Sequence, residues 1–429
     1  MERDITLRRV FRTWWPLAAS WIMMGFELPV ASAVIARLPN PSVHLAAYGG
    51  VVFPLSLVIE APIIMLLSAS TALCRDRDTY ARLRRFMIVS ALVLGAVHFA
   101  LAATPLYDLV VDRLLGVPEE IRGPARLGML IFTPWTPAIA YRRFQQGLLI
   151  RFGRSRAVGI GTAVRLGANV ATLLAGMAYG GLPGIVVGAT AISVGVIAEA
   201  IYAGAVARAV VRGPLQLAEV RGAPLTLRAM LSFYVPLAIT PLFTMMAHPV
   251  MSAALSRMPR ALESLAVLPV LNGLVFTLRS LGFAFNEVVV VMLDDAGARR
   301  ALARFARVLG VSTTALLLIV IVTPLGRFWF TGVSALEGEL AVLAGRGLWI
   351  AVLFPAFSVI HSYYQGDLVH THRTRGITEA MMLSLATICA VLVAGVRHGG
   401  VTGLYYGLAA NLAGYVVQAL WLRRRARES

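Results

Sequence analysis

Long apolar stretches alternate along the chain with short polar segments rich in arginine. A helix needs about 20 mostly apolar residues to cross a bilayer core of about 30 Å, because every backbone polar group must find its hydrogen bond within the segment. Stretches of about this length lie near residues 14–36, 45–73, 86–104, 127–150, 157–178, 183–207, 231–256, 265–292, 306–323, 344–369, 376–396 and 401–422. The pattern predicts an all-α integral membrane protein with 12 transmembrane helices.

The composition disfavours a soluble enzyme, a disordered chain and a disulfide scaffold. Of the 429 residues, 58% are hydrophobic and only 14% are charged, whereas soluble domains are about half apolar and about a quarter charged. The formal charge of +18 does not indicate nucleic-acid binding, because all 39 basic residues are arginines that lie mainly in short loops. We therefore expect the lipid bilayer, and no nucleic acid, as a partner.

The distribution of arginine predicts the orientation in the membrane. Most of the 39 arginines fall in the terminal segments and in every second loop, on the side of the chain termini. Because loops rich in arginine stay in the cytoplasm, both termini should be cytoplasmic. We expect a monomeric, multi-pass protein of a plasma membrane of the bacterial inner-membrane type.

The chain contains an internal duplication. Residues 16–39 align without a gap on 236–259, with prolines, Arg37 and Arg257 in register. Further on, Gln146-Gly147 matches Gln365-Gly366 at an offset of 219 residues. Each copy holds an even number of spans, so the two copies should have the same orientation and be related by a pseudo-twofold axis along the membrane normal.

This duplication predicts two parallel six-helix repeats with a site between them near the middle of the membrane. The predicted domains are an N-lobe at residues 1–210, a cytoplasmic linker at 211–228 and a C-lobe at 229–429.

Two repeated segments resemble the multidrug/oligosaccharidyl-lipid/polysaccharide (MOP) exporter superfamily. They are Phe144-Gln145-Gln146-Gly147 with the basic loop Gly153-Arg154-Ser155-Arg156, and Tyr364-Gln365-Gly366 with Arg373-Thr374-Arg375. Members often carry Gln-Gly followed by a basic loop at the end of the fourth and tenth helices. The segment 230–238, Tyr48-Gly49 and Arg75-Asp76-Arg77 are similar to the progressive ankylosis (ANKH) branch of that superfamily.

The resemblance implies a MATE-like V of two six-helix lobes that opens alternately to either side of the membrane. It also implies efflux from the cytoplasm, and for the ANKH branch an anionic cargo such as pyrophosphate, nucleotide or citrate. In drug-extruding relatives a carboxylate of the first helix takes part in ion coupling, and that helix bends at a proline. Glu27 and Pro29 stand in comparable places, although the local sequence around Glu27 is different.

Ionisable residues inside the spans are the candidate functional groups, because a charge at the bilayer centre costs about 2.5–3.5 kcal/mol unless it faces a partner or a wet cavity. Glu60 lies midway along the second span, and Arg279 occupies the equivalent depth on the eighth. If they face each other across the pseudo-twofold axis, they form a gate, an element of the site or a static ion pair.

Three further arginines lie at a similar depth in the fourth and fifth spans. Arg142 and Arg143 cannot both face inward, since they are about 100° apart on a helix. Two interpretations of Arg143 stay open: contact with cargo, or snorkelling to lipid headgroups. Arg165, with Asn169 one turn further on the same face, is the stronger candidate for contact with cargo. Arginines at one level can hold a carboxylate or phosphate with paired hydrogen bonds.

Other polar residues in the spans take supporting roles in this interpretation. We expect Glu27, Glu60, His248 and Glu287 to couple ions or gate, and Asn286 to line the cavity. Pro29 and Pro249 each remove one helix hydrogen bond and predict symmetric flex points. Glu199, in the sixth span, is interpreted as a packing or interfacial group.

Together with the efflux and the anionic cargo that the resemblance implies, the charged residues in the spans lead us to expect a secondary exporter of a small organic or phosphorylated anion. Arg142, Arg165 and Arg279 would neutralise the cargo. No P-loop, no zinc-protease helix and no nucleophile elbow is present in the sequence, so an enzyme and a bound cofactor are not expected, and H⁺ or Na⁺ coupling stays open. The alternatives are H⁺- or Na⁺-coupled extrusion of cationic drugs, with Glu27 and Glu60 as counter-charges, flipping of a lipid-linked anion, and a role outside transport. A cavity with excess arginine favours an anion, and one with excess carboxylate favours a cation.

Overall fold

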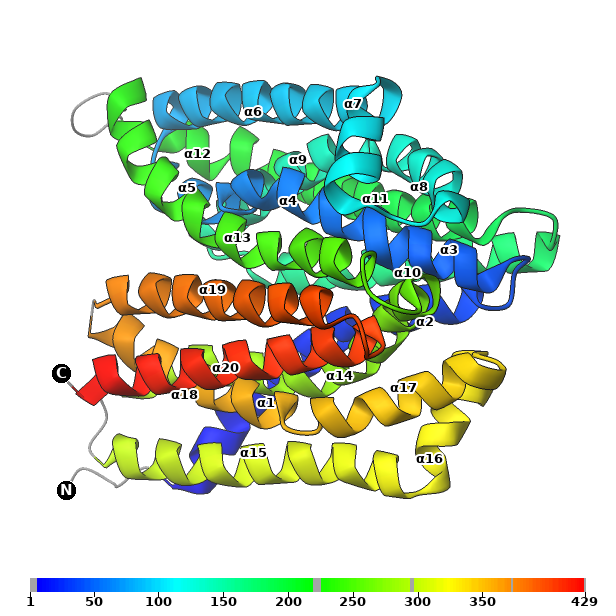
Figure 1. Cartoon of the computed structure of the whole chain (residues 1–429). Helices are drawn as coiled ribbons and strands as arrows, with labels where there is room; N and C mark the ends of the chain where they lie inside the picture. Colours follow the sequence, from blue (N-terminus) through cyan, green and yellow to red (C-terminus); the bar gives the residue numbers. More distant parts are fainter. Residues whose placement is uncertain (1–5, 219–224, 294–296, 372, 428–429) are drawn as a thin grey trace. The chain divides into compact units, whose positions relative to one another are not determined.

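The computed structural model describes residues 6–218, 225–293, 297–371 and 373–427, and these ranges are helical apart from short connections (Figure 1). The first repeat contains α1 (Leu7–Gly25), α2 (Glu27–Ile35), α3 (Pro41–Ala47), η1 (Tyr48–Val52), α4 (Phe53–Ile64), α5 (Leu66–Leu73), α6 (Arg77–Ala103), α7 (Leu106–Asp108), η2 (Leu109–Leu115), α8 (Glu119–Phe132), α9 (Trp135–Arg151), α10 (Arg156–Tyr179), α11 (Gly184–Arg212) and α12 (Pro214–Leu217). The second repeat contains α13 (Leu227–Leu255), α14 (Ala261–Met292), α15 (Ala298–Val322), α16 (Pro324–Arg327), η3 (Phe328–Val333), α17 (Gly338–Ala351), α18 (Phe354–His370), α19 (Arg375–His398) and α20 (Gly403–Arg427).

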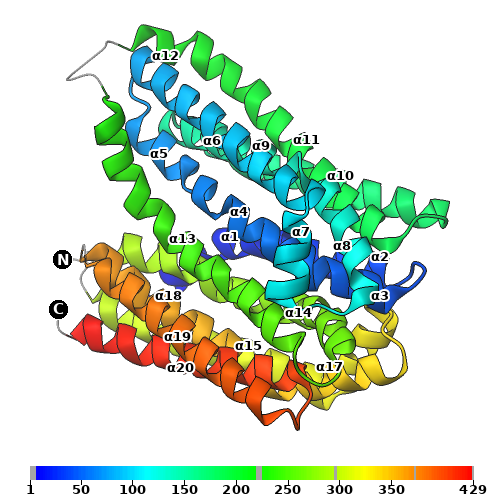
Figure 2. The same cartoon turned by 45° about the horizontal axis from the view of Figure 1, so that its top comes forward.

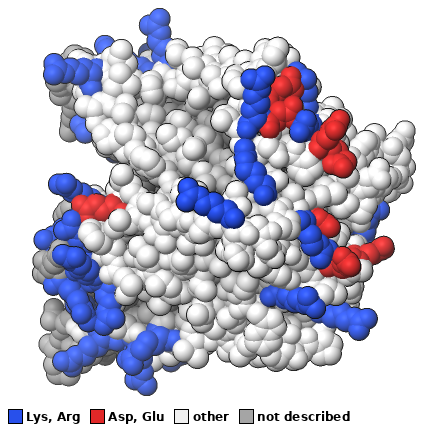
Figure 3. Space-filling model, viewed as in Figure 1, with Lys and Arg blue, Asp and Glu red and all other residues white. Residues whose placement is uncertain are grey.

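The all-α fold class is confirmed, and each predicted span falls on a helix or on consecutive helices. Within the described residues, ten helical segments are long and apolar enough to cross a membrane. The other two predicted spans coincide with the pair α8–α9 and with α20. Much of the face shown in Figure 3 is uncharged, and many of its charged side chains lie toward the left and right edges of the view. The protein is a multi-pass membrane protein.

The duplication is visible in the ends of the helices. Helix α9 spans Trp135–Arg151 and α18 spans Phe354–His370, so both ends are displaced by the predicted 219 residues. The same displacement relates α10 to α19. The two helices that follow the Gly-Gly turns, α11 and α20, lie beside α10 and α19 respectively (Figures 1 and 2). Each repeat therefore folds its last helical hairpin in the same way.

The chain forms two compact units whose boundaries differ from the predicted lobes. Unit 1 comprises Met1–Ala36 and Ala253–Ser429, and unit 2 comprises Arg37–Ser252. The first helix of the chain thus belongs with the second repeat, and most of α13 belongs with the first repeat. The predicted division at residues 210 and 229 follows the duplication, whereas the units follow the packing.

Specific contacts explain why α1 belongs to unit 1. Trp14 Nε1 donates a hydrogen bond to the carbonyl of Leu281 on α14, at 2.9 Å. Gly25 lies so close to α14 that a Cβ at this position would be 3.3 Å from the Cα of Thr277. Trp14 thus ties α1 to α14 by a partly buried hydrogen bond, and Gly25 permits the close approach of the two helices.

Helix α13 is tied to unit 2 by Tyr234. Its hydroxyl donates a hydrogen bond to the carbonyl of Pro62 on α4. Its ring also packs edge-on against Phe86 of α6, with the centroids 4.9 Å apart. A buried tyrosine whose hydroxyl has a partner adds both apolar area and a directional bond.

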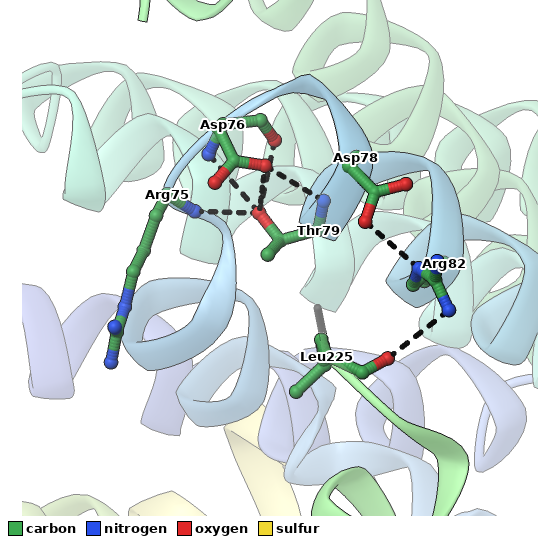
Figure 4. Close-up of polar contacts among 6 residues, drawn as sticks. All are labelled: Arg75, Asp76, Asp78, Thr79, Arg82 and Leu225. Carbon is green, nitrogen blue, oxygen red and sulfur yellow. Dashed lines mark hydrogen bonds and ion pairs between the residues drawn. The ribbon is translucent and has the colours of Figure 1, made fainter. Parts of the chain in front are cut away.

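The start of α6 is fixed by a capping box (Figure 4). Asp76 Oδ1 accepts a hydrogen bond from the backbone nitrogen of Thr79 at 2.9 Å, and Thr79 Oγ1 accepts from the backbone nitrogens of Asp76 and Arg75. One turn later, Arg82 pairs with Asp78 and donates to the carbonyl of Leu225, which precedes α13. The Arg-Asp-Arg loop thus has a clear role in starting α6.

We expect Asp76→Ala to lower the free energy of unfolding by about 1 kcal/mol, because it leaves first-turn N–H groups of α6 without their acceptor. Asp78→Ala is the matched control and should cost about 0.5 kcal/mol or less, since it removes only an exposed i,i+4 ion pair. Denaturant unfolding followed by circular dichroism in detergent measures both. Equal losses in the two variants would contradict the capping role.

Candidate functional site

A buried glutamate joins three helices of unit 2. Glu199 of α11 is 1% exposed and forms an ion pair with Arg142 of α9. Its other carboxylate oxygen accepts a hydrogen bond from Gln146 Nε2 at 2.9 Å. Arg165 of α10 lies on the same carboxylate, with Nε 3.7 Å from Oε2. Two arginines thus share one carboxylate in an apolar interior.

Helix geometry accounts for this convergence. Arg142 and Gln146 are one turn apart on α9, and Arg165 and Asn169 are one turn apart on α10, so each pair shares a helix face. On α11, Gly195 lies one turn before Glu199. A Cβ at Gly195 would be 3.0 Å from the Arg165 carbonyl oxygen and 3.2 Å from the Asn169 Cβ. The absence of a side chain at Gly195 therefore lets α10 approach closely enough for Arg165 to reach Glu199.

The charges of this region extend to Arg143 and Glu60. Arg143 is partly buried and lies within electrostatic range of Arg142, Glu60, Glu199 and Arg165. Glu60, on α4, is 5% exposed. We refer to Glu60, Arg142, Arg143, Arg165 and Glu199 as the charged cluster. Its three arginines exceed its two glutamates, so its formal charge is positive.

The equivalent positions of the second repeat carry little charge. At the offset of 219 residues, Arg142 corresponds to His361, Arg165 to Ser384 and Glu199 to Gln418. Gly195 corresponds to Gly414, and a Cβ there would again crowd the neighbouring helix, at 2.9 Å from Ser384 Oγ. The close helix approach is therefore common to both repeats, and the charged cluster is peculiar to the first.

Unit 1 instead contains Arg279 in an aromatic setting. Arg279 of α14 donates a hydrogen bond from Nη1 to the hydroxyl of Tyr415 on α20, at 2.7 Å. Its guanidinium carbon lies 4.6 Å from the centre of the Tyr415 ring and 5.4 Å from that of Phe283. Its Nε is buried without a hydrogen-bond partner. His361 lies beside it, with Nε2 3.0 Å from the Tyr415 carbonyl. In the part of the chain that the structure describes, Arg279 forms no ion pair.

The structure brings some of the predicted residues together and separates others. Arg142 and Arg165, which the sequence places at a similar depth, both pair with Glu199, and Asn169 lies one turn from Arg165 on α10. Contact of these residues with cargo stays a prediction. Glu60 belongs to unit 2 and Arg279 to unit 1, so their mutual pairing stays a prediction. His248, on α13 in unit 2, has an exposed side chain, and its gating role also stays a prediction.

Three further predicted residues lie in unit 1, and two of them connect helices. Asn286 Nδ2 of α14 donates to the carbonyl of Ser362 on α18, at 3.2 Å. Glu287, half-buried on α14, is hydrogen-bonded by Trp21 of α1. Glu27 is the first residue of α2, where its partly exposed carboxylate lies at a positive helix end. These contacts define where the three side chains lie. The predicted roles of Asn286 in the cavity and of Glu27 and Glu287 in ion coupling stay predictions.

The two prolines predicted as flex points lie in different surroundings. Between α1 and α2 the helix is interrupted at Phe26, and Pro29 cannot donate to the carbonyl of Gly25, which instead receives a hydrogen bond from Thr277 Oγ1 at 3.5 Å. Pro249 lies inside α13, which continues through it to Leu255. The predicted symmetry between the two positions is therefore not seen in the helix breaks.

Glu199 is the functional candidate that sequence reasoning missed, since it was interpreted as a packing group. The available signal was that Glu199 corresponds to a neutral residue, Gln418, in the duplication.

Within the described residues no group of three or more His, Cys, Asp or Glu side chains is placed to hold a metal ion.

Comparison with known proteins identifies the fold. No protein-family model and no curated protein sequence matches this chain. Solved structures do match, among them a multidrug resistance MATE family transporter of the MOP superfamily in an inward-facing conformation, with a TM-score of 0.72, 14% identity and coverage of 96% of this chain and 98% of that one. The fold is MATE-like.

Two further structures share this fold. The lipid II flippase MurJ, in an inward closed conformation, has a TM-score of 0.73 and 14% identity, with coverage of 96% of this chain and 87% of MurJ. A MOP superfamily transporter from Pyrococcus furiosus, described as having a binding pocket of reverse polarity and a different function, has a TM-score of 0.60 and 14% identity, with coverage of 99% of both chains. These neighbours are transporters rather than enzymes, whereas placement in the ANKH branch remains a prediction.

We expect Glu199→Gln to lower the free energy of unfolding by about 3–5 kcal/mol, because it leaves two buried arginines without their carboxylate. Adding Arg142→Gln should recover part of the loss. The control is Glu339→Gln, whose carboxylate is 83% exposed beside Arg260 and should contribute less than about 1 kcal/mol. Denaturant unfolding of the purified protein in detergent measures these differences. A loss at Glu199 no larger than at Glu339 would refute the role of Glu199 as the hub.

Proposed function

We propose that this protein is a secondary transporter that exports a small organic or phosphorylated anion by alternating access. The proposal combines the MATE-like fold, shared with several transporters, with the positive character of the polar sites inside the units. Citrate, pyrophosphate and nucleotides are the cargo classes to which the resemblance to the ANKH branch points.

Arg279 carries the proposal. A guanidinium in a membrane protein normally has a carboxylate partner or water. Arg279 has a tyrosine hydroxyl and two aromatic faces instead. The rings orient the guanidinium and leave donors for a carboxylate or phosphate, which binds arginine through two parallel hydrogen bonds. An incoming anion would supply the missing negative charge.

The charged cluster of unit 2 also favours a negatively charged cargo. Its arginines outnumber its glutamates, and Arg142 and Arg165 already neutralise Glu199. We propose that this excess attracts the anion, and that Glu27, Glu60 and His248 couple H⁺ or Na⁺ movement or gate the pathway. Pro29 and Pro249 would let the first and seventh spans flex. Both termini would lie in the cytoplasm, because arginine concentrates on their side.

A flippase for a lipid-linked anion is the second candidate, and the structural likeness to lipid II flippase MurJ favours it. The same arginines would then hold a diphosphate headgroup rather than a soluble anion. Extrusion of cationic drugs is less compatible with the excess of arginine, because a cation would be repelled.

Transport by proteoliposomes containing the purified protein tests the proposal. We expect uptake of at least one of labelled citrate, pyrophosphate and ATP, and a reduction of at least about tenfold in Arg279→Ala, corresponding to loss of one charge-assisted hydrogen bond. Arg279→Lys keeps the charge but loses the paired geometry, and should fall in between. Arg346→Ala, at an exposed position of α17 in the same unit, is the control and should transport normally.

Uptake of a cationic dye without uptake of any of the three anions would contradict the proposal. Movement of a lipid-linked diphosphate across the bilayer, with no movement of the soluble anions, would decide for the flippase.

A further inference from the structure

A basic cavity lies in unit 1 where α18 ends, α19 begins and α20 ends. Its volume is about 360 Å³, and its wall is formed by Leu368, Arg373, Arg375, Gly376 and Arg425. This size falls in the range of small-ligand sites, about 300–1,000 Å³. We propose that the cavity binds the phosphodiester headgroup of an anionic phospholipid such as phosphatidylglycerol. This inference is separate from the proposed function, because it requires no transport.

One carboxylate organises the arginines of this cavity without neutralising them all. Glu379 of α19 pairs with Arg425, whose Nη2 and Nε lie 2.5 Å and 2.8 Å from Oε2. It also pairs with Arg375, whose Nε lies 3.3 Å from Oε1. Three arginines thus line the cavity beside a single carboxylate, and their combined charge is positive. Figure 3 shows arginine side chains gathered at this end of unit 1.

Of the three arginines that line the cavity, Arg373 is the best placed to contact a ligand. Its backbone nitrogen donates to the Leu368 carbonyl at 2.8 Å, and its carbonyl accepts from the nitrogen of Gly376 at 3.2 Å. The backbone at Arg373 is therefore fixed at the wall of the cavity. Its side chain is exposed and has no ion pair or hydrogen bond to the described residues. The Arg373 guanidinium keeps all its donors for a phosphate.

The surroundings favour a lipid over a free phosphate. Trp421 of α20 donates to Glu379 Oε2 at 3.2 Å and packs against the Arg425 guanidinium, 5.5 Å from its ring centre. Tryptophan beside arginine at a helix end is typical of the headgroup level of a membrane. Leu420, next to Trp421, is 62% exposed, and Met382, on α19, is 49% exposed. An acyl chain attached to a headgroup in the cavity can lie along these apolar side chains.

The first repeat contains the matched control. Arg154 and Arg156 correspond to Arg373 and Arg375, but Ile160 replaces Glu379 and Val206 replaces Arg425. The first repeat therefore has the loop arginines without the third arginine and the carboxylate that orients it. Non-specific attraction of acidic lipids should be the same at both loops, whereas the proposed cavity exists at one.

Native mass spectrometry of the full chain in detergent, titrated with phosphatidylglycerol or phosphatidylcholine, tests the proposal. We expect the tightest site to prefer phosphatidylglycerol, and Arg373→Ala to weaken it by about tenfold or more. Arg154→Ala should leave it unchanged. Because Arg373 supports no other side chain, its variant should unfold at the same temperature as the parent protein, which a thermal scan verifies.

Equal effects of Arg373→Ala and Arg154→Ala, or equal binding of the two lipids, would overturn the proposal. A third arm adds soluble glycerol phosphate to the lipid-free protein. If it binds as tightly as phosphatidylglycerol and depends equally on Arg373, the cavity takes a free phosphate, and the lipid assignment fails.

Discussion

The cost of placing charge inside an apolar bundle is the constraint on which this structure depends. A charge buried without a partner destabilises a protein by several kcal/mol, about 3–5 when one member of a buried pair is lost. In unit 2 this constraint is met by Glu199, which reaches α9 and α10 from α11. In unit 1 it is met at Arg279 by a hydroxyl and two aromatic rings. The two solutions differ because only the first contains the compensating carboxylate.

Duplication supplied two copies of one helical framework, and substitution gave them different chemistry. The close helix approaches at Gly195 and Gly414 recur at equivalent positions, as do the ends of the last hairpin helices. Several ionisable positions do not recur: Arg165 corresponds to Ser384, and Glu199 to Gln418. Packing positions are preserved because they determine how helices meet, whereas polar positions that do not set the helix approach are free to differ between the repeats.

Much of the fold could be predicted from the sequence, because a helix that crosses a bilayer requires a long apolar segment, and such a segment can be recognised from the residue types alone. The similar depth of Arg142 and Arg165, with Asn169 one turn further on the same helix face, was also predictable from helix geometry alone. The grouping of α1 with unit 1 could not be predicted, because an internal duplication does not show which helices pack against each other. It depends on contacts such as Trp14 with the Leu281 carbonyl.

The hub position of Glu199 was missed for a similar reason: one ionisable residue in a span does not identify its partners. Pro29 and Pro249 looked equivalent in sequence, yet the helix is broken only near the first. A proline removes one hydrogen bond in either case, and the neighbouring helices decide whether the chain bends.

The central claim is that the guanidinium of Arg279 forms the anion-binding point of a transporter. Equilibrium binding of radiolabelled pyrophosphate and citrate to the purified protein tests it most directly, without requiring a gradient or a coupling ion. We predict saturable binding of at least one anion that is lost in Arg279→Ala and unaffected by excess organic cation. Two results would contradict this claim. In the first, the Arg279→Ala variant binds the anion as tightly as the parent protein. In the second, organic cations displace the bound anion and other anions do not.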